Sequence, residues 1–167
     1  MATPGAYVTA VAPSVNDLDV FFVDTSGSLW RAYSAYPSQP TLLATKVGLP
    51  SEGASGGPIA AVSRQPGYLD VVFQSANPSN GGTWYSSTSG GQQWATGNVP
   101  VGDASGGISI LAPSSYELRV LTIDSRQNGA TSDWVASGAP SWSSVDYLEL
   151  PNPYLPPVPV PRPIGKL

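Results

Sequence analysis

The sequence predicts an all-β protein made of three repeats. Gly and Pro number 18 each among its 167 residues, and they interrupt every segment before a helical pattern of apolar residues develops. Short apolar segments alternate with polar turns, and similar segments return about fifty residues later along the chain. We therefore expect one folded domain over residues 1–150, with about twelve short strands in three four-stranded units at 6–50, 57–100 and 107–150.

Each unit opens with a short apolar strand that follows a Gly or Pro break. These strands are expected at residues 6–11, 58–62 and 107–111. The second strand gives the clearest match between the units, at residues 18–24, 69–75 and 118–124. Its alternating apolar residues predict one face that enters a core, through Leu18, Val20 and Phe22 in the first unit and Leu69, Val71 and Phe73 in the second. Asp19 and Asp70 then occupy matching outward positions.

A polar turn connects the second strand of each unit to a third strand that carries Trp. Asp24-Thr25-Ser26-Gly27 is typical of such turns, because Asp bonds its own backbone and Gly accepts a positive φ. We align Trp30, Trp84 and Trp134 at one position of the repeat, and Trp94 and Trp142 at a second. A fourth strand follows in each unit and ends at a Pro, at residue 50, 100 or 151.

The composition excludes several classes of function. The chain holds no Cys and no His, so we expect no thiolate or imidazole catalysis, no zinc site of the usual kind and no cofactor. The net charge is −4 and the seven Lys and Arg residues are scattered, which argues against nucleic acid as a partner. No apolar run reaches the about 18 residues of a membrane span, and nothing near Met1 resembles a signal peptide. We expect neither membrane insertion nor an export signal.

Residues 18–33 resemble one blade of the lectin-type β-propellers, the tectonin-like and fungal fucose-lectin-like group. In those blades a strand, an Asp/Gly turn and a Leu-Trp strand follow each other, as they do here. A second resemblance lies in Ser87–Trp94, which is similar to the Asp-box turn of sialidase-type propellers, with Ser89 and Gln93 in place of its Asp and Thr. The blade resemblance does not imply fucose specificity, because the Arg and Glu after the Gly-x-Ile of that family have no counterpart after Gly27-Ser28-Leu29.

The number of units raises the question of ring closure. Three blades are fewer than the about four to eight that usually close a propeller. The resemblance therefore implies association, and two copies of the chain would make six blades. The alternative is a β-trefoil or another three-repeat β fold, which closes within one chain. Gln92-Gln93-Trp94 matches the Gln-x-Trp of trefoil lectins once, so the sequence leaves both architectures open.

The Trp residues have two interpretations. They pack in the core and between units, or one set of them lines shallow pockets and stacks on sugar rings. Polar neighbours would then hydrogen-bond the sugar hydroxyl groups. The candidate glycan-binding residues are Trp30, Arg31, Trp84, Tyr85, Gln92, Trp94, Asp133 and Trp134.

Residues 151–167 form a segment of different character. Seven of these seventeen residues are Pro, which predicts an extended polyproline II arm that cannot join a central strand. One interpretation is a disordered tail. The other is an arm that fastens the chain to a second copy or to another protein subunit, because it is more apolar than a solvated linker needs to be. The residues expected to make that contact are Tyr154, Leu155, Val158, Val160, Arg162 and Ile164.

Two classes of function remain. The first is a non-enzymatic, lectin-like adhesion module that binds glycans, as the blade resemblance and the Trp residues imply. The carboxylates around the second strand could form a glycosidase pair, but Asp at turns ordinarily bonds its own backbone. The second is a structural subunit without a sugar ligand, such as a decoration protein on a virion or another extracellular surface assembly. One chain can combine both roles, with the arm as anchor and the folded domain as the glycan-binding part.

Overall fold

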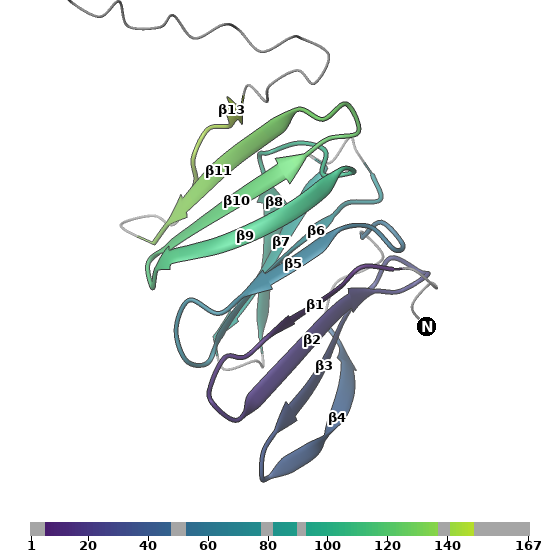
Figure 1. Ribbon diagram of the computed structural model, residues 1–167, viewed down its shortest axis with the longest axis vertical. Helices are drawn as coiled ribbons and strands as arrows, with labels where there is room; N and C mark the ends of the chain where they lie inside the picture. Colours follow the sequence, from purple (N-terminus) through teal and green to yellow (C-terminus); the bar gives the residue numbers. More distant parts are fainter. Residues whose placement is uncertain (1–5, 48–52, 78–81, 90–92, 137–140, 149–167) are drawn as a thin grey trace, which may run out of the picture.

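The computed structural model describes residues 6–47, 53–77, 82–89, 93–136 and 141–148 of the chain. These residues form three antiparallel sheets that lie one after another, each made of consecutive strands (Figure 1). Strands of different units share no sheet among the described residues, which favours propeller blades over a trefoil. The arm at 151–167 and Gln92 lie outside the described residues.

The strands follow the chain across each sheet. The first sheet holds β1 (Val8–Val11), β2 (Asp17–Val23), β3 (Leu29–Ala35) and β4 (Gln39–Lys46). The second holds β5 (Ile59–Val62), β6 (Tyr68–Gln74), β7 (Thr83–Ser89) and β8 (Trp94–Val99). The third holds β9 (Gly107–Ser114), β10 (Glu117–Ile123), β11 (Gly129–Val135) and β12 (Ser141–Trp142), and β13 (Asp146–Leu148) also pairs with β11.

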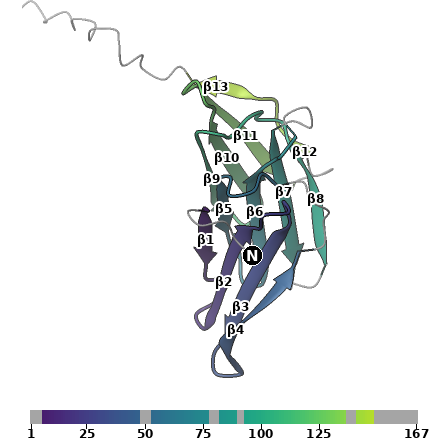
Figure 2. The same ribbon diagram turned by 90° about the vertical axis from the view of Figure 1, so that its right-hand side faces the viewer.

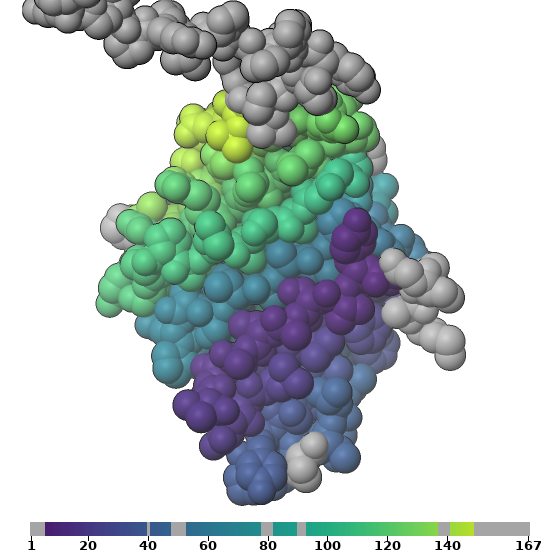
Figure 3. Space-filling model, in the orientation of Figure 1, coloured from purple at the N-terminus to yellow at the C-terminus, as the bar shows by residue number. Residues whose placement is uncertain are grey.

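The three sheets are arranged like neighbouring blades. The first strands β1, β5 and β9 contact each other from sheet to sheet on one side of the molecule, while β4, β8 and β12 lie on the other side (Figure 2). In the space-filling view the sheets appear as successive bands in sequence order (Figure 3). In the described part of the chain, no helix has the length and apolar character that crossing a membrane requires.

Strand pairing corrects one alignment made from the sequence. Equivalent pairs are Phe22 with Trp30, Phe73 with Trp84 and Thr122 with Ala130. Trp134 pairs instead with Leu118, and the equivalent residue of the second sheet is Thr88. The alignment of Trp134 with Trp30 and Trp84 is therefore wrong. The β10–β11 turn is as short as the β2–β3 turn, so Trp134 lies four residues farther along β11 than Trp30 lies along β3. Trp94 and Trp142 pair with Thr88 and Trp134 and are equivalent, as predicted.

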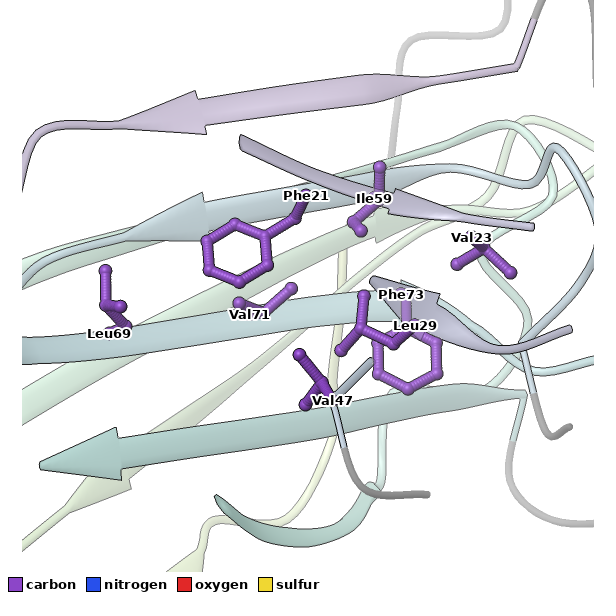
Figure 4. Close-up of a cluster of buried hydrophobic side chains, with 8 residues drawn as sticks. All are labelled: Phe21, Val23, Leu29, Val47, Ile59, Leu69, Val71 and Phe73. Carbon is purple, nitrogen blue, oxygen red and sulfur yellow. The ribbon is translucent and has the colours of Figure 1, made fainter. Parts of the chain in front are cut away.

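Each sheet has two faces, which we name from its second strand. The first face carries Leu18, Val20 and Phe22 or their equivalents, and the second face carries the residues that alternate with them, beginning with Asp19. The second face of the first sheet packs on the first face of the second sheet, which makes the first junction (Figure 4). Its buried residues are Phe21, Val23, Leu29, Val47, Ile59, Leu69, Val71 and Phe73.

The second junction repeats this arrangement. The second face of the second sheet packs on the first face of the third sheet. Its buried residues are Val72, Tyr85, Val99, Val101, Ile110, Leu118, Val120 and Ala130. The core therefore lies between the sheets, and the middle sheet is covered on both faces.

Two expectations about burial need correction. The predicted core face is confirmed for Leu69, Val71 and Phe73, but in the first sheet Leu18 is 40% exposed, because no described sheet covers its first face. Asp19 and Asp70 do not point outward: they are 1% and 0% exposed. The alternation within each strand was predicted correctly, but the next sheet covers the face that was expected to meet solvent.

The Asp turns form as predicted. Asp24 Oδ1 accepts hydrogen bonds of 2.8 Å from the backbone N–H groups of Ser26 and Ser28, and Oδ2 accepts one of 2.8 Å from Trp30 Nε1. Gly27 adopts the positive φ of 78° that ends this turn. Burial by itself would raise the pKa of Asp24, but these hydrogen bonds outweigh burial and hold the pKa well below its usual range. The turn therefore fixes the approach of β3, the strand that carries Arg31.

Candidate functional site

A pocket of about 230 Å³ opens at the first junction. We call it the first junction pocket. Strands β2 and β3 supply Asp17, Asp19, Arg31 and Tyr33 to its wall, and Leu69 closes it from the second sheet. The pocket exists because two sheets meet there, so no single unit contains it.

The polar centre of this pocket is an ion pair between Asp19 and Arg31. Arg31 Nε donates a hydrogen bond to Asp19 Oδ1, and the side chains are 15% and 1% exposed for Arg31 and Asp19. The Arg31 guanidinium also lies 4.6 Å from the centroid of the Tyr33 ring, within the range of a cation–π contact. The pocket thus presents a positive group, a carboxylate and an aromatic ring from neighbouring strands.

The equivalent place at the second junction has different chemistry. Tyr85 takes the position of Arg31 and donates its hydroxyl hydrogen to Asp70 Oδ1 over 2.8 Å. Arg64 Nε donates to Asp70 Oδ2 over 2.9 Å, and its guanidinium lies 4.5 Å from the Trp134 ring. Burial raises the pKa of Asp70, against the opposing effects of Tyr85 and Arg64. The contact of Arg64 with Trp134 joins this hydrogen-bonded group of the second sheet to the third sheet.

The second face of the third sheet carries a related pair in an open setting. Arg119 and Asp133 occupy the positions of Asp19 and Tyr33, and they form two hydrogen bonds of 2.6 and 2.8 Å. The side chains are 54% and 41% exposed. Hydrogen bonding to Arg119 lowers the pKa of Asp133. A smaller pocket of about 110 Å³ lies beside them, lined also by Leu118 and Val135.

The predicted Trp residues lie mainly in packing positions. Trp84 and Trp94 pack against the first junction, where Trp94 meets Phe21 edge-on at 5.9 Å between ring centroids. Trp134 packs at the second junction under Arg64. Trp30 lies on the first face of the first sheet and stacks on Phe22, with 6.5 Å between centroids and 5° between the rings.

The seven candidates that the structure describes therefore do not line one pocket. Arg31 lines the first junction pocket, Asp133 lines the smaller pocket, and Tyr85 is buried at the second junction. Sequence reasoning missed Asp19 and Tyr33 as pocket residues. The recurrence of a carboxylate at Asp19 and Asp70 was the available signal, because a charge at a position covered by the next sheet needs a partner. In the described part of the chain, no cluster of three acidic side chains is suited to a metal ion.

Comparison with known proteins gives structural likeness without sequence likeness. No family model matches the chain, and no curated protein matches it. A lectin from Burkholderia pseudomallei aligns with a TM-score of 0.66 and 20% identity, over 88% of this chain and 42% of that one. The Aleuria aurantia lectin, described as a six-bladed β-propeller with a fucose recognition mode, aligns at 0.64 with 16% identity, over 86% and 46%. The fold of this chain is that of consecutive β-propeller blades.

A third lectin aligns with this chain over the same share of its length. The SapL1 lectin, solved in complex with α-methyl fucoside, aligns with a TM-score of 0.58 and 18% identity, over 86% of this chain and 46% of that one. This chain thus spans less than half the length of these three lectins. The predicted blade architecture is confirmed. The Asp-box turn is not: Ser87–Ser89 belong to β7, and residues 90–92 lie outside the described residues.

Proposed function

We propose that this chain is a non-enzymatic glycan-binding module that holds one sugar residue in the first junction pocket. The observation that carries the proposal is the Asp19–Arg31 pair beside Tyr33, in a pocket between two blades of a fold that known lectins share. The pocket is smaller than the about 300–1,000 Å³ of sites for drug-sized ligands, which suits a single sugar ring.

The side chains supply the interactions that a sugar needs. Hydroxyl groups both donate and accept hydrogen bonds, so a guanidinium donor next to the carboxylate acceptors Asp17 and Asp19 matches a pair of neighbouring hydroxyls. The Tyr33 ring and the Leu69 side chain provide apolar contact for the C–H groups of the ring. The ion pair and the cation–π contact hold Arg31 before the ligand arrives, which lowers the ordering cost of binding.

Fucosides are the first ligand class to test, because two of the similar lectins are described with fucose or a fucoside. Isothermal titration of the full chain with α-methyl fucoside, methyl galactoside and methyl mannoside would compare three neutral sugars. We expect millimolar or tighter binding of at least one sugar. A glycan array extends the comparison to larger ligands. The absence of binding in both experiments would contradict the proposal.

Variants locate the site. Arg31→Ala and Tyr33→Ala should each weaken sugar binding at least tenfold, because they remove the charged donor and the ring contact. Arg126→Ala and Tyr116→Ala are the matched controls, since both residues lie in exposed turns away from the pocket. Trp30→Ala should leave binding unchanged. Loss of binding in Trp30→Ala with retention in Arg31→Ala would move the site to the Trp surface.

A further inference from the structure

The first face of the first sheet is an apolar surface without a cover among the described residues. Val8 and Leu18 are 59% and 40% exposed, whereas the equivalent residues of the second sheet, Ile59 and Leu69, are 7% and 2% exposed. In the third sheet the equivalent Leu118 is 1% exposed. The same positions that form a core in two units are therefore left open in the first.

The second face of the third sheet is open in the same way. Leu111 and Val135 are 58% and 38% exposed there, and Leu121 is half-buried. Leu121 is equivalent to Phe21 and Val72, which are both fully buried at the two junctions. This face therefore has the apolar residues of a junction, but no sheet in the described part of the chain covers it.

We propose that two copies of this chain close one ring of six sheets. In this dimer, the first face of the first sheet in each copy packs on the second face of the third sheet in its partner. A second copy fits both open faces, because each copy carries the complement of the other's open face. The faces would pack as the sheets already pack at the two internal junctions. The proposal rests on the fold and does not depend on glycan binding.

Three observations support closure by two copies. The described residues form three blades, and they align with 46% of a lectin described as six-bladed. Three blades of a six-bladed ring span half a turn, so a twofold axis completes the ring with two identical junctions. On the open face of the third sheet Arg119 pairs with Asp133, and Glu117 and Asp146 leave an excess of negative charge. The open face of the first sheet carries the exposed Lys46, whose charge is opposite.

The dimer would also complete the smaller pocket. Arg119 and Asp133 occupy the positions of Asp19 and Tyr33 in the first junction pocket, where Leu69 forms the opposite wall. The residue equivalent to Leu69 in a first sheet is Leu18, so the partner's Leu18 would form that wall. Each dimer then has two such pockets at its intersubunit junctions. Their use for glycans rests on the proposed function, whereas the dimer itself is tested without any sugar.

The test is the mass of the purified full chain in solution, measured by light scattering on a size-exclusion column and by sedimentation over a range of concentrations. We expect twice the chain mass of 17.2 kDa at high concentration. Leu18→Asp and Leu111→Asp should each raise the dimer dissociation constant at least tenfold, because each substitution places a charge in both junctions. Leu43→Asp is the matched control, since Leu43 is 46% exposed on a strand but belongs to neither open face.

The variants sit at exposed positions, so each chain should keep its fold, which circular dichroism and tryptophan fluorescence check. A monomer at every concentration would overturn the proposal. A dimer that survives both Leu18→Asp and Leu111→Asp would place the interface elsewhere and also overturn it. Open assemblies of three or more copies would show that the faces join without closing a ring of six. Sugar binding by a monomer would leave the proposed function intact while rejecting the dimer.

Discussion

The hydroxyl group of Tyr85 donates a hydrogen bond of 2.8 Å to Asp70 inside the second junction. Burial, together with the neighbouring Asp70 carboxylate, raises the pKa of Tyr85 above its usual range, so the hydroxyl remains a donor at all ordinary pH values. Asp70 is fully buried, and its second oxygen accepts from Arg64. The Asp70 carboxylate thereby binds two side chains, and these contact the third sheet: Tyr85 meets the Trp142 ring and Arg64 lies over the Trp134 ring.

Tyr85→Phe tests that link. The substitution keeps the ring but leaves one oxygen of a buried carboxylate without its donor, so we expect a loss of about 1–3 kcal/mol in the free energy of unfolding. Chemical denaturation followed by tryptophan fluorescence measures it. Tyr116→Phe is the control, because Tyr116 is 68% exposed and its loss should be negligible. Equal stability of the two variants would mean that the Tyr85–Asp70 bond adds nothing to the junction.

Asp24→Asn tests the turn that positions β3. The pKa of Asp24 is lower in the folded chain than its ordinary value near 4, so its stabilising effect is present above about pH 4 and is lost as the pH falls further. An Asn side chain has one oxygen that accepts hydrogen bonds and an NH2 group that only donates. The hydrogen bond from Trp30 Nε1 should therefore be lost. We expect a loss of about 1–3 kcal/mol at neutral pH and a flatter decline in stability below pH 4.

Unfolding free energies of wild type and Asp24→Asn, measured from neutral pH to pH 2, give this comparison. Asp124→Asn changes the equivalent turn of the third sheet, where Asp124 accepts from Arg126 and Asn128 in an exposed setting. A smaller effect is expected there because water replaces the lost interactions. If the unfolding free energy of Asp24→Asn fell below pH 4 as steeply as that of wild type, other carboxylates would dominate the loss of stability in acid.

Leu69→Ala and Leu18→Ala compare equivalent positions in two sheets. Leu69 is 2% exposed at the first junction, so its truncation should cost about 2–5 kcal/mol of unfolding free energy. Leu18 is 40% exposed in the single chain, so its truncation should cost much less when the chain is dilute. Denaturation at low protein concentration measures both. Similar losses in the two variants would mean that the first face of the first sheet is buried even in the dilute single chain.

Gly82→Ala and Gly97→Ala compare a glycine directly before β7 with a glycine within β8. A Cβ atom at Gly82, which has a φ of +76°, would lie 2.4 Å from the backbone carbonyl of Gly102. Gly82 and Gly102 both lie in connecting segments whose backbone cannot shift cheaply, so we expect a severe loss of stability or of soluble protein. Gly97 has an ordinary φ and open space around it, so Ala there should be neutral or stabilise by about 0.4–1 kcal/mol. Thermal melts of the two variants provide the measurement.

Local sequence patterns were enough to predict the blades. Alternating apolar residues in Leu69–Ser75 set the faces of β6, and the Asp24 turn depends on residues within six positions of each other. Such interactions are short in sequence, so spacing and residue type carry them. The alignment of Trp134 failed because the Trp lies near the start of β3 but near the end of β11, and only the pairing with Leu118 reveals that register.

The candidate site depended on how the sheets meet. The pattern of β2 is the same whether its second face meets water or another sheet, so the sequence could not tell that Asp19 is buried or that Leu69 closes a pocket over Arg31 and Tyr33. Burial is a property of contacts between residues about fifty positions apart, and no local pattern encodes it. The order of the strands was determined locally, whereas the pocket and the two open faces were decided by the packing of one blade on the next.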